Sequence, residues 1–345
     1  MGAWQDRVEV VHADARDFVS TLAASSVDLA LCDAPYGLGL TKHRRNAPTN
    51  WDASGVAFDP AFWTMVKASL KTGSLLLAMG HPRTAHRQTS ALDAAGFAIL
   101  DSLVFAKSHG FAAHARSLDG ALRKIGATAE LADSYAGWGT HLAPRHELIT
   151  VCQNLGPGES LAEAIANGGA GGMHLDAVRV TGPPEDRARV PGRVSDSASW
   201  SVQRPATTNV PHAAGRYPGN LILEHAQFCD KQECEESCVV RRMNEDDGRH
   251  KYRIGRADDQ PSRFFTALKY TPRAATAPHP TAKSNQLADW LCALTVRPGS
   301  VVLDLFSGSG ALGFAAARAG AARVICVERE AEYVDLIRGR LLLRD

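Results

Sequence analysis

Short apolar runs alternate with amphipathic stretches along the first hundred residues. Runs rich in β-branched residues or leucine predict strands at 8–12, 27–32, 74–79 and 99–107. Apolar residues spaced three to four apart predict helices over 60–71 and 84–95, which Gly73 and Gly96 would end. Because strands and helices alternate, the pattern predicts an α/β fold around a parallel sheet.

The same alternation returns near the other end of the chain. A strand predicted at 147–153 is followed by a stretch, 156–219, that is rich in Gly, Pro, Ser, Thr and Arg and predicts mostly loops. Within it, Ser160 and Glu163 have the spacing of a helix capping box. Beyond it, the pattern predicts helices at 286–294 and 310–319 and strands at 300–306 and 323–328.

A glycine-rich turn, with Gly308 and Gly310, joins the buried strand at 300–306 to the next helix. Glycine lets the backbone approach a ligand closely, and Glu328 ends the following strand, where an acid can bind ribose hydroxyls. The turn also matches the dinucleotide fingerprint GxGxxG. A dinucleotide domain would begin with this unit, but only 35 residues follow Gly310. The remaining strands must therefore come from upstream. The turn is predicted to bind a nucleotide-containing cofactor other than a dinucleotide; a different nucleotide and a purely structural turn are the alternatives.

The tetrapeptide Asp33-Ala34-Pro35-Tyr36 directly follows the predicted strand 27–32, and strand ends are where α/β sheets bind ligands. An exocyclic amino group that is to be methylated needs two acceptors for its N–H bonds, so that its lone pair faces the methyl group. The Asp33 carboxylate and the Ala34 carbonyl can supply the acceptors, and the Tyr36 ring can supply a stacking face. A simple proline-containing turn is the alternative.

Together these features resemble the DNA amino-methyltransferases, which act on adenine N6 or cytosine N4 and have Asp-Pro-Pro-Tyr at this place. Ala34 departs from that motif, keeping the backbone carbonyl but loosening the loop. A glycine loop late in the sequence is typical of the permuted, β-type order, and other segments resemble the phage and prophage-like branch. The resemblance implies a Rossmann-like S-adenosylmethionine-dependent methyltransferase sheet, circularly permuted, with a loop-rich target-recognition insertion.

The resemblance also implies roles for residues outside the tetrapeptide. Asp14 would receive the amino group of the cofactor's adenine, although it could instead cap the helix that follows it. Lys283 belongs to a segment that would close over the methionine end of the cofactor, with an ordinary surface lysine as the alternative. The other cofactor-binding residues implied are Asp304, Phe306, Gly308, Gly310 and Glu328.

On this basis the chain divides into a catalytic half (1–153), a target-recognition insertion (154–275) and a cofactor-binding half (276–345). Charge adds a constraint: 38 Lys and Arg balance 37 Asp and Glu, which excludes binding of DNA by bulk charge alone. A local basic loop is predicted to contact DNA phosphates, with a solvated surface loop as the alternative. Its basic residues are Lys42, Arg44 and Arg45.

Seven cysteines, an odd number, suit a reducing compartment better than a disulfide scaffold. Four potential metal ligands lie close together in the sequence, at His225, Cys229, Cys234 and Cys238. They are compatible with a structural, tetrahedral Cys3His zinc site, since small insertions without a large core often gain stability from a metal. The spacing departs from the common CxxC knuckle, so three ordinary reduced cysteines in a polar helix are the alternative.

The predicted function is site-specific methyl transfer from S-adenosylmethionine to adenine N6 in DNA, with base flipping and no covalent enzyme intermediate. The preference for adenine rests on the resemblance, because cytosine N4 makes the same geometric demand. A non-catalytic DNA-binding remnant, an RNA methyltransferase and a protein-glutamine methyltransferase are the competing interpretations. No apolar run approaches the length of a membrane span and no secretion signal is recognisable. A cytoplasmic location is therefore expected. The resemblance implies a restriction-modification or phage type, and a monomer or homodimer is expected.

Overall fold

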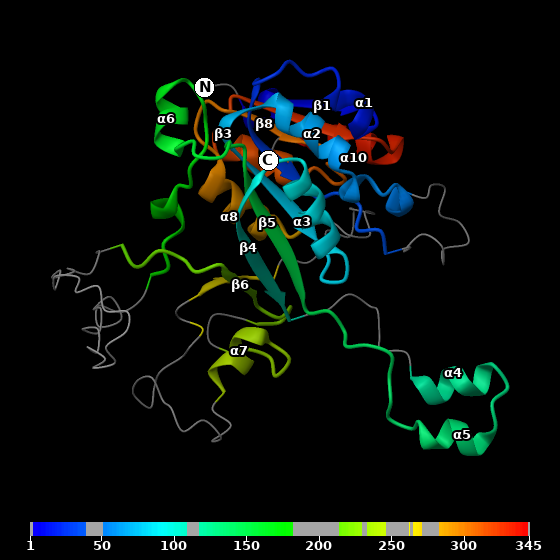
Figure 1. Ribbon diagram of the computed structural model, residues 1–345. Helices are drawn as coiled ribbons and strands as arrows, with labels where there is room; N and C mark the ends of the chain where they lie inside the picture. Colours follow the sequence, from blue (N-terminus) through cyan, green and yellow to red (C-terminus); the bar gives the residue numbers. More distant parts are fainter. Residues whose placement is uncertain are drawn as a thin grey trace, which may run out of the picture.

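The computed structural model describes residues 3–38, 51–108, 117–181, 214–229, 233–245, 262, 265–270 and 283–343. Within these ranges the strands form one nine-stranded sheet, in the order β1-β9-β8-β2-β3-β5-β4-β6-β7 (Figure 1). The strands are β1 (Val8–His12), β2 (Val27–Cys32), β3 (Leu70–Gly80), β4 (Ala98–Lys107), β5 (His146–Gln153), β6 (Leu221–Glu224), β7 (Thr266–Leu268), β8 (Val301–Asp304) and β9 (Arg323–Glu328). Because β8 and β9 lie between β1 and β2, upstream strands complete the sheet around the glycine turn, as predicted.

Helices cover both faces of this sheet. On one face, side chains of β2, β3 and β8 pack with α8 (Asn285–Thr295) and α9 (Ala311–Arg318). On the other face, these strands pack with α1 (Ala15–Val19), α2 (Pro60–Ser69) and α3 (Ala85–Ala94). Successive strand residues point to opposite faces, so a strand buried on both sides needs apolar residues at nearly every position. This explains the continuous apolar runs in the sequence.

The predicted strands correspond to β1, β2, β3, β4, β5, β8 and β9, with shifted ends in some cases. Gly96, with φ of 82°, follows α3 as predicted, but the prediction for Gly73 is wrong. Helix α2 ends at Ser69, and Gly73 lies inside β3 with φ of 83°. A Cβ atom on Gly73 would lie 2.3 Å from the carbonyl oxygen of Ala170. This glycine therefore permits two segments of the chain to approach closely.

One strand breaks the parallel pattern that the sequence predicts. β5 pairs antiparallel with both β3 and β4, after the helical hairpin of α4 (Leu118–Lys124) and α5 (Ala129–Ser134). The hairpin projects from the end of the sheet at which β4 finishes and β5 begins (Figure 1). An antiparallel strand begins at the edge where its parallel neighbours end. The reversal therefore brings the first residues of β5 to the carboxyl edge of the sheet.

Two short strands, β6 and β7, extend the far side of the sheet. A small apolar cluster packs between β6 and α7 (Val239–Asn244). The capping box at Ser160 and Glu163 is confirmed at the start of α6 (Leu161–Ala166). The other helical elements are α10 (Ala331–Leu342), η1 (Trp4–Arg7), η3 (Trp51–Ala53), η4 (Val56–Phe58) and η5 (Leu175–Val178). Among the described residues, none of the helices combines the length and the apolar character that crossing a membrane requires.

Candidate active site

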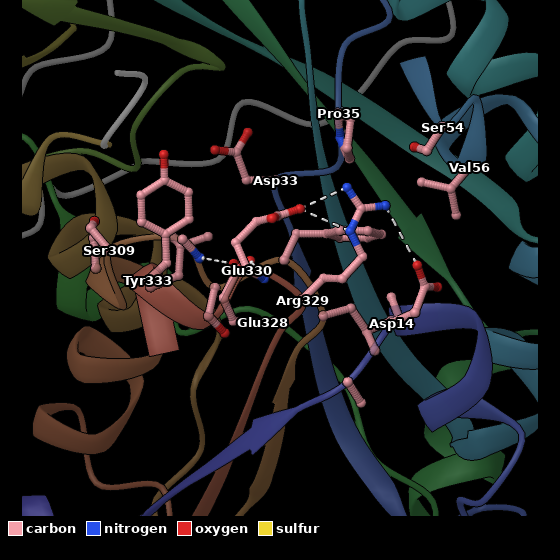
Figure 2. A pocket seen from close by; sticks show the side chains of 18 of the residues that line it. Asp14, Asp33, Pro35, Ser54, Val56, Ser309, Glu328, Arg329, Glu330 and Tyr333 are labelled. Atoms are coloured by element: carbon pink, nitrogen blue, oxygen red, sulfur yellow. Dashed lines mark hydrogen bonds and ion pairs between the residues drawn. The ribbon is translucent and has the colours of Figure 1, made fainter. Parts of the chain in front are cut away.

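A pocket opens at the carboxyl ends of β1, β2, β8 and β9, between the glycine turn and the tetrapeptide (Figure 2). Its space, including the part open to solvent, is about 880 Å³. The predicted site residues that line it are Asp14, Asp33, Pro35, Lys283, Phe306, Gly308 and Glu328. Segments from both ends of the chain therefore build one cavity.

The glycine turn is held by the carboxylate of Glu328. Its Oε2 accepts a hydrogen bond from the Gly308 N–H at 2.7 Å, and its Oε1 accepts one from the Glu330 N–H at 2.8 Å. Burial raises the pKa of this carboxyl group, against the effect of these backbone donors. Gly310, with φ of 81°, is the N-cap of α9, and a Cβ atom there would lie 2.9 Å from the Phe314 ring. Gly310 shapes the turn but is not among the residues that line the pocket.

Asp304 lies beneath the turn instead of in the pocket wall. Its side chain is completely buried at the end of β8, and burial raises its pKa to about 7. A Cβ atom on Gly313 would lie 3.6 Å from Asp304 Oδ2, so the carboxyl group faces the first turn of α9. The turn covers this residue, and its predicted contact with the cofactor stays a prediction.

The tetrapeptide presents two of its residues to the pocket. Asp33 and Pro35 line it, whereas Ala34 and Tyr36 are only 1% and 6% exposed. The Tyr36 hydroxyl donates a hydrogen bond to Asp33 Oδ1 at 3.0 Å, and the Tyr36 ring lies 6.1 Å from the ring of His81. The tyrosine braces the Asp33 carboxylate; its role as a stacking face for a base stays a prediction.

The residue after the tetrapeptide, Gly37, anchors this loop. Its N–H donates a hydrogen bond to Oδ1 of the buried Asp52 at 3.0 Å. Its φ of 66° is in the left-handed region, and a Cβ atom would lie 2.7 Å from the ring of Phe58. Both the backbone conformation and the space around it therefore require glycine.

We expect Gly37→Ala to lower the free energy of unfolding by about 2–3 kcal/mol, because it adds a steric clash to the cost of a left-handed backbone. Gly55→Ala is the matched control. Gly55 has φ of 67° but no atom within 4 Å of the Cβ position, so this variant should lose only about 1 kcal/mol. Urea unfolding of both variants measures the difference, and equal losses would contradict the role of Phe58.

Charged side chains form a buried row behind Asp33. The Lys283 Nζ lies 2.9 Å from Asp33 Oδ2 and 3.5 Å from Glu147 Oε2. It also donates a hydrogen bond to the Tyr36 hydroxyl at 2.6 Å. On the far side, the Lys107 Nζ lies 2.6 Å from Glu147 Oε1. The side chains of Lys283 and Glu147 are only 7% and 4% exposed, so Lys283 is not an ordinary surface lysine.

The charges in this row set one another's pKa values. Burial alone would raise the pKa of Glu147, but Lys283 and Lys107 bring it down to about 2. Burial also raises the pKa of Asp33, and the Lys283 ammonium opposes this rise. Although burial disfavours the charged form of Lys283, the two carboxylates raise its pKa. Lys283 therefore stays charged and favours the ionised form of Asp33.

Asp14 lines the pocket and also caps α1, so the structural role that the sequence left open for it is present. Its Oδ1 accepts a hydrogen bond from the Arg16 N–H at 2.9 Å, and its Oδ2 lies 3.6 Å from the Arg329 guanidinium. Figure 2 shows Arg329 between Asp14 and Glu330, with which it forms an ion pair at 2.8 Å. The contact of Asp14 with a cofactor adenine stays a prediction.

Sequence reasoning missed several residues of this site, namely Lys107, Glu147, Arg329, Glu330 and Tyr333. A charged residue at the start of the predicted strand 147–153, next to Leu148 and Ile149, was the available signal for Glu147. The predicted DNA-binding residues Lys42, Arg44 and Arg45 lie outside the described residues. The four predicted metal ligands lie together beside β6 and α7.

Among the solved structures that resemble this chain are two that illustrate the likeness. PvuII DNA methyltransferase (cytosine-N4-specific) is 10% identical, with a TM-score of 0.54 over 98% of this chain and 87% of that chain. The M1.HpyAVI–SAM complex is 14% identical, with a TM-score of 0.47 over 97% of this chain and 100% of that chain. At 10% identity, the likeness to the PvuII enzyme concerns the fold alone.

The family model N6_N4_Mtase, described as DNA methylase, matches residues 27–339. The matched range contains the tetrapeptide, Glu147, Lys283 and the glycine turn, and thus most of the elements that build the pocket. The chain therefore belongs to the N6_N4_Mtase family of DNA methylases.

Proposed function

We propose that this protein transfers a methyl group from S-adenosylmethionine directly to N6 of a flipped adenine in DNA. The observation that carries the proposal is the shared pocket: Asp33 lines the same cavity as Gly308 and Glu328. A target amine held by the tetrapeptide would therefore lie next to a cofactor held by the glycine turn. Base flipping is required because the amino group inside a duplex is out of reach of such a pocket.

The lining of the pocket fits this cofactor. Apart from Asp33, which is assigned to the target amine, its carboxylates belong to Asp14, Glu328 and Glu330. They suit a ligand that carries a sulfonium and an ammonium group, and Glu328, at the end of β9, suits ribose hydroxyls. Phe306 and Gly308 would form the wall along which the cofactor lies. When bound, S-adenosylmethionine supplies an electrophilic methyl group.

Asp33 orients the target amine in this proposal. Its carboxylate accepts one N–H of the amine, and the Ala34 carbonyl accepts the other, which leaves the nitrogen lone pair free to form the N–C bond. The amine must also release a proton, and Asp33, whose pKa burial raises, is the carboxylate placed to receive it. Lys283 and the Tyr36 hydroxyl hold Asp33 in position. An amino nitrogen is already a nucleophile, so no covalent enzyme intermediate is needed.

The proposal also gives a role to the predicted insertion and to the predicted DNA-binding residues. The insertion 154–275 would recognise the target sequence, and Lys42, Arg44 and Arg45 would contact phosphates beside the flipped base. The position of β8 and β9 between β1 and β2 supports the circularly permuted order. The preference for adenine over cytosine N4 rests on the resemblance of the sequence, since both amines need the same pair of acceptors.

The proposal is tested by incubating the protein with methyl-labelled S-adenosylmethionine and unmethylated DNA and digesting the DNA to nucleosides. Label in N6-methyladenine supports it. Label in N4-methylcytosine would support the same mechanism with cytosine, not adenine, as the target base. DNA binding without transfer would identify a non-catalytic remnant, and transfer to RNA or protein alone would contradict the choice of substrate.

A second expectation concerns the cofactor end of the pocket. We expect Glu328→Gln to weaken S-adenosylmethionine binding at least about 10-fold, because a hydrogen bond to a charged acceptor contributes about 1.5–3 kcal/mol, a factor of about 10 to 150. Isothermal titration calorimetry measures this change. Asp335→Asn on the exposed side of α10 is the control and should bind normally. Unchanged affinity of the Glu328 variant would remove Glu328 from the cofactor site.

A further inference from the structure

Four potential metal ligands converge next to the edge of the sheet. His225 directly follows β6, Cys238 directly precedes α7, and Cys229 and Cys234 lie in the segment between them. Their ligand atoms all lie within 4.8 Å of one another. Residues up to 13 positions apart in the sequence are thus folded around one point.

The distances between these atoms match a tetrahedral zinc site. The His225 Nδ1 lies 3.4 Å from the Cys234 Sγ and 3.6 Å from the Cys238 Sγ. With Zn–N bonds of about 2.0–2.1 Å and Zn–S bonds of about 2.3 Å, the N···S edge of a tetrahedron is about 3.6 Å. The cluster therefore needs little rearrangement to hold an ion.

The surroundings of the four residues are also those of a metal site. All three cysteines are free thiols, and Cys238 is completely buried. The Glu235 N–H donates a hydrogen bond to the Cys229 Sγ at 3.4 Å, as backbone amides do toward metal-bound thiolates. Free thiols grouped around an imidazole satisfy one another poorly as hydrogen-bonding partners, because a thiol is a weak donor and a weak acceptor.

We propose that His225, Cys229, Cys234 and Cys238 bind one structural zinc ion. Three thiolates and an imidazole are soft and borderline donors, which favours zinc over magnesium or calcium. Four protein ligands fill the tetrahedral shell and leave no position for water or substrate, so the ion has no part in methyl transfer. The site is independent of the proposed reaction.

The ion would stabilise a part of the fold that has little core. The apolar cluster at this edge contains only four buried residues among those described, Leu223, Ala226, Cys238 and Val240. The metal-binding segment contacts two strands of the sheet. His225 N–H donates a hydrogen bond to Leu268 O of β7 at 2.9 Å, and Val239 N–H donates one to Ser108 Oγ, next to β4, at 2.9 Å. Zinc would therefore hold α7 and the segment after β6 against this edge of the sheet.

The experiment measures metal in the full-length protein, purified without chelator, by inductively coupled plasma mass spectrometry. We expect about one equivalent of zinc per chain. Replacing zinc with Co²⁺ should give the visible spectrum of tetrahedral cobalt with thiolate charge-transfer bands. Substoichiometric zinc even after reconstitution with ZnCl₂, or an octahedral cobalt spectrum, would overturn the proposal. These measurements use the unmodified chain, so they do not depend on the folding of a variant.

Two variants locate the ion. Cys234→Ala, at a partly exposed ligand, should lose the zinc and the tetrahedral cobalt spectrum. Cys292→Ala, at a buried cysteine of α8 outside the cluster, is the matched control and should keep both. Retention of one equivalent by the Cys234 variant would contradict the assigned ligands, as would a disulfide between two of the three cysteines in a thiol titration of the purified protein.

Discussion

Replacing Asp33 by alanine is expected to lower the rate of methyl transfer at least about 100-fold, because the target amine loses its charged acceptor and the carboxylate placed to receive its proton. Binding of S-adenosylmethionine should change little, since the cofactor is assigned mainly to Glu328 and the glycine turn. Single-turnover transfer of label to DNA and calorimetric titration of the cofactor measure the two effects separately.

The controls for this variant address its fold and its partners. Asp33→Ala leaves the buried Lys283 with Glu147 as its remaining carboxylate partner, at 3.5 Å. The thermal unfolding midpoint must therefore be measured beside the activity. Retained transfer in a folded protein would refute the role of Asp33. A loss of cofactor binding equal to the loss of transfer would instead assign Asp33 to the cofactor.

Glu147→Gln should lower the free energy of unfolding by about 3 kcal/mol at neutral pH, because it removes the buried carboxylate between Lys283 and Lys107 and leaves two ammonium groups under-compensated. The size agrees with the pKa of Glu147, which is about 2 in the folded protein against an ordinary value of 4.5. Urea unfolding measures the loss. Glu130→Gln, at an exposed position of α5, is the control and should stay within about 0.5 kcal/mol of the parent.

The effect of Glu147 depends on pH in a defined direction. A carboxyl group whose pKa is lowered by folding stabilises the protein above its unfolded pKa, and this stabilisation is lost as the pH falls through the folded value. The difference between the parent and Glu147→Gln should therefore be largest above about pH 5 and shrink toward about pH 3. A difference that does not change with pH would mean that Glu147 acts through its shape and not through its charge.

A double-mutant cycle measures the interaction between Lys283 and Glu147 separately from their contacts with other residues. Lys283→Met and Glu147→Gln each remove one of the two charged partners of the other residue. The double variant should therefore be less destabilised than the sum of the two single variants, with a coupling energy of about 1–3 kcal/mol. If Lys283 positions Asp33, the Lys283 variant should also lose transfer activity while remaining folded. Additive losses would show that the contact at 3.5 Å contributes little.

The elements that the sequence predicts well are those whose own residues carry the signal. β2 is apolar at nearly every position because both faces of the sheet are covered, and α3 ends at Gly96 because the residue there needs a left-handed backbone. Gly73 shows the limit of the same reasoning. Its left-handed φ is real, but the contact that requires it comes from Ala170, almost a hundred residues later, and no local pattern reports such a contact.

The residues of the active site also fall into two groups: those that a local sequence motif reveals and those that it does not. Asp33 and Gly308 stand in recognisable local motifs at strand ends, and both line the pocket. Glu147 stands in no motif, and its importance depends on the reversal of β5, which carries its carboxylate to the carboxyl edge of the sheet. Asp304 shows the converse, because a residue in a strong motif lies under the turn and not in the pocket wall.

Local periodicity and residue type are enough to predict the alternation of strands and helices, the chemistry of the tetrapeptide and the glycine turn, and the grouping of His225 with three cysteines. The burial of Lys283 between Asp33 and Glu147, and the meeting of the four candidate metal ligands at one point, become visible only in the folded chain. Burial, pKa shifts and ligand geometry arise from atoms distant in the sequence, because the packing of the whole sheet sets the distances between them.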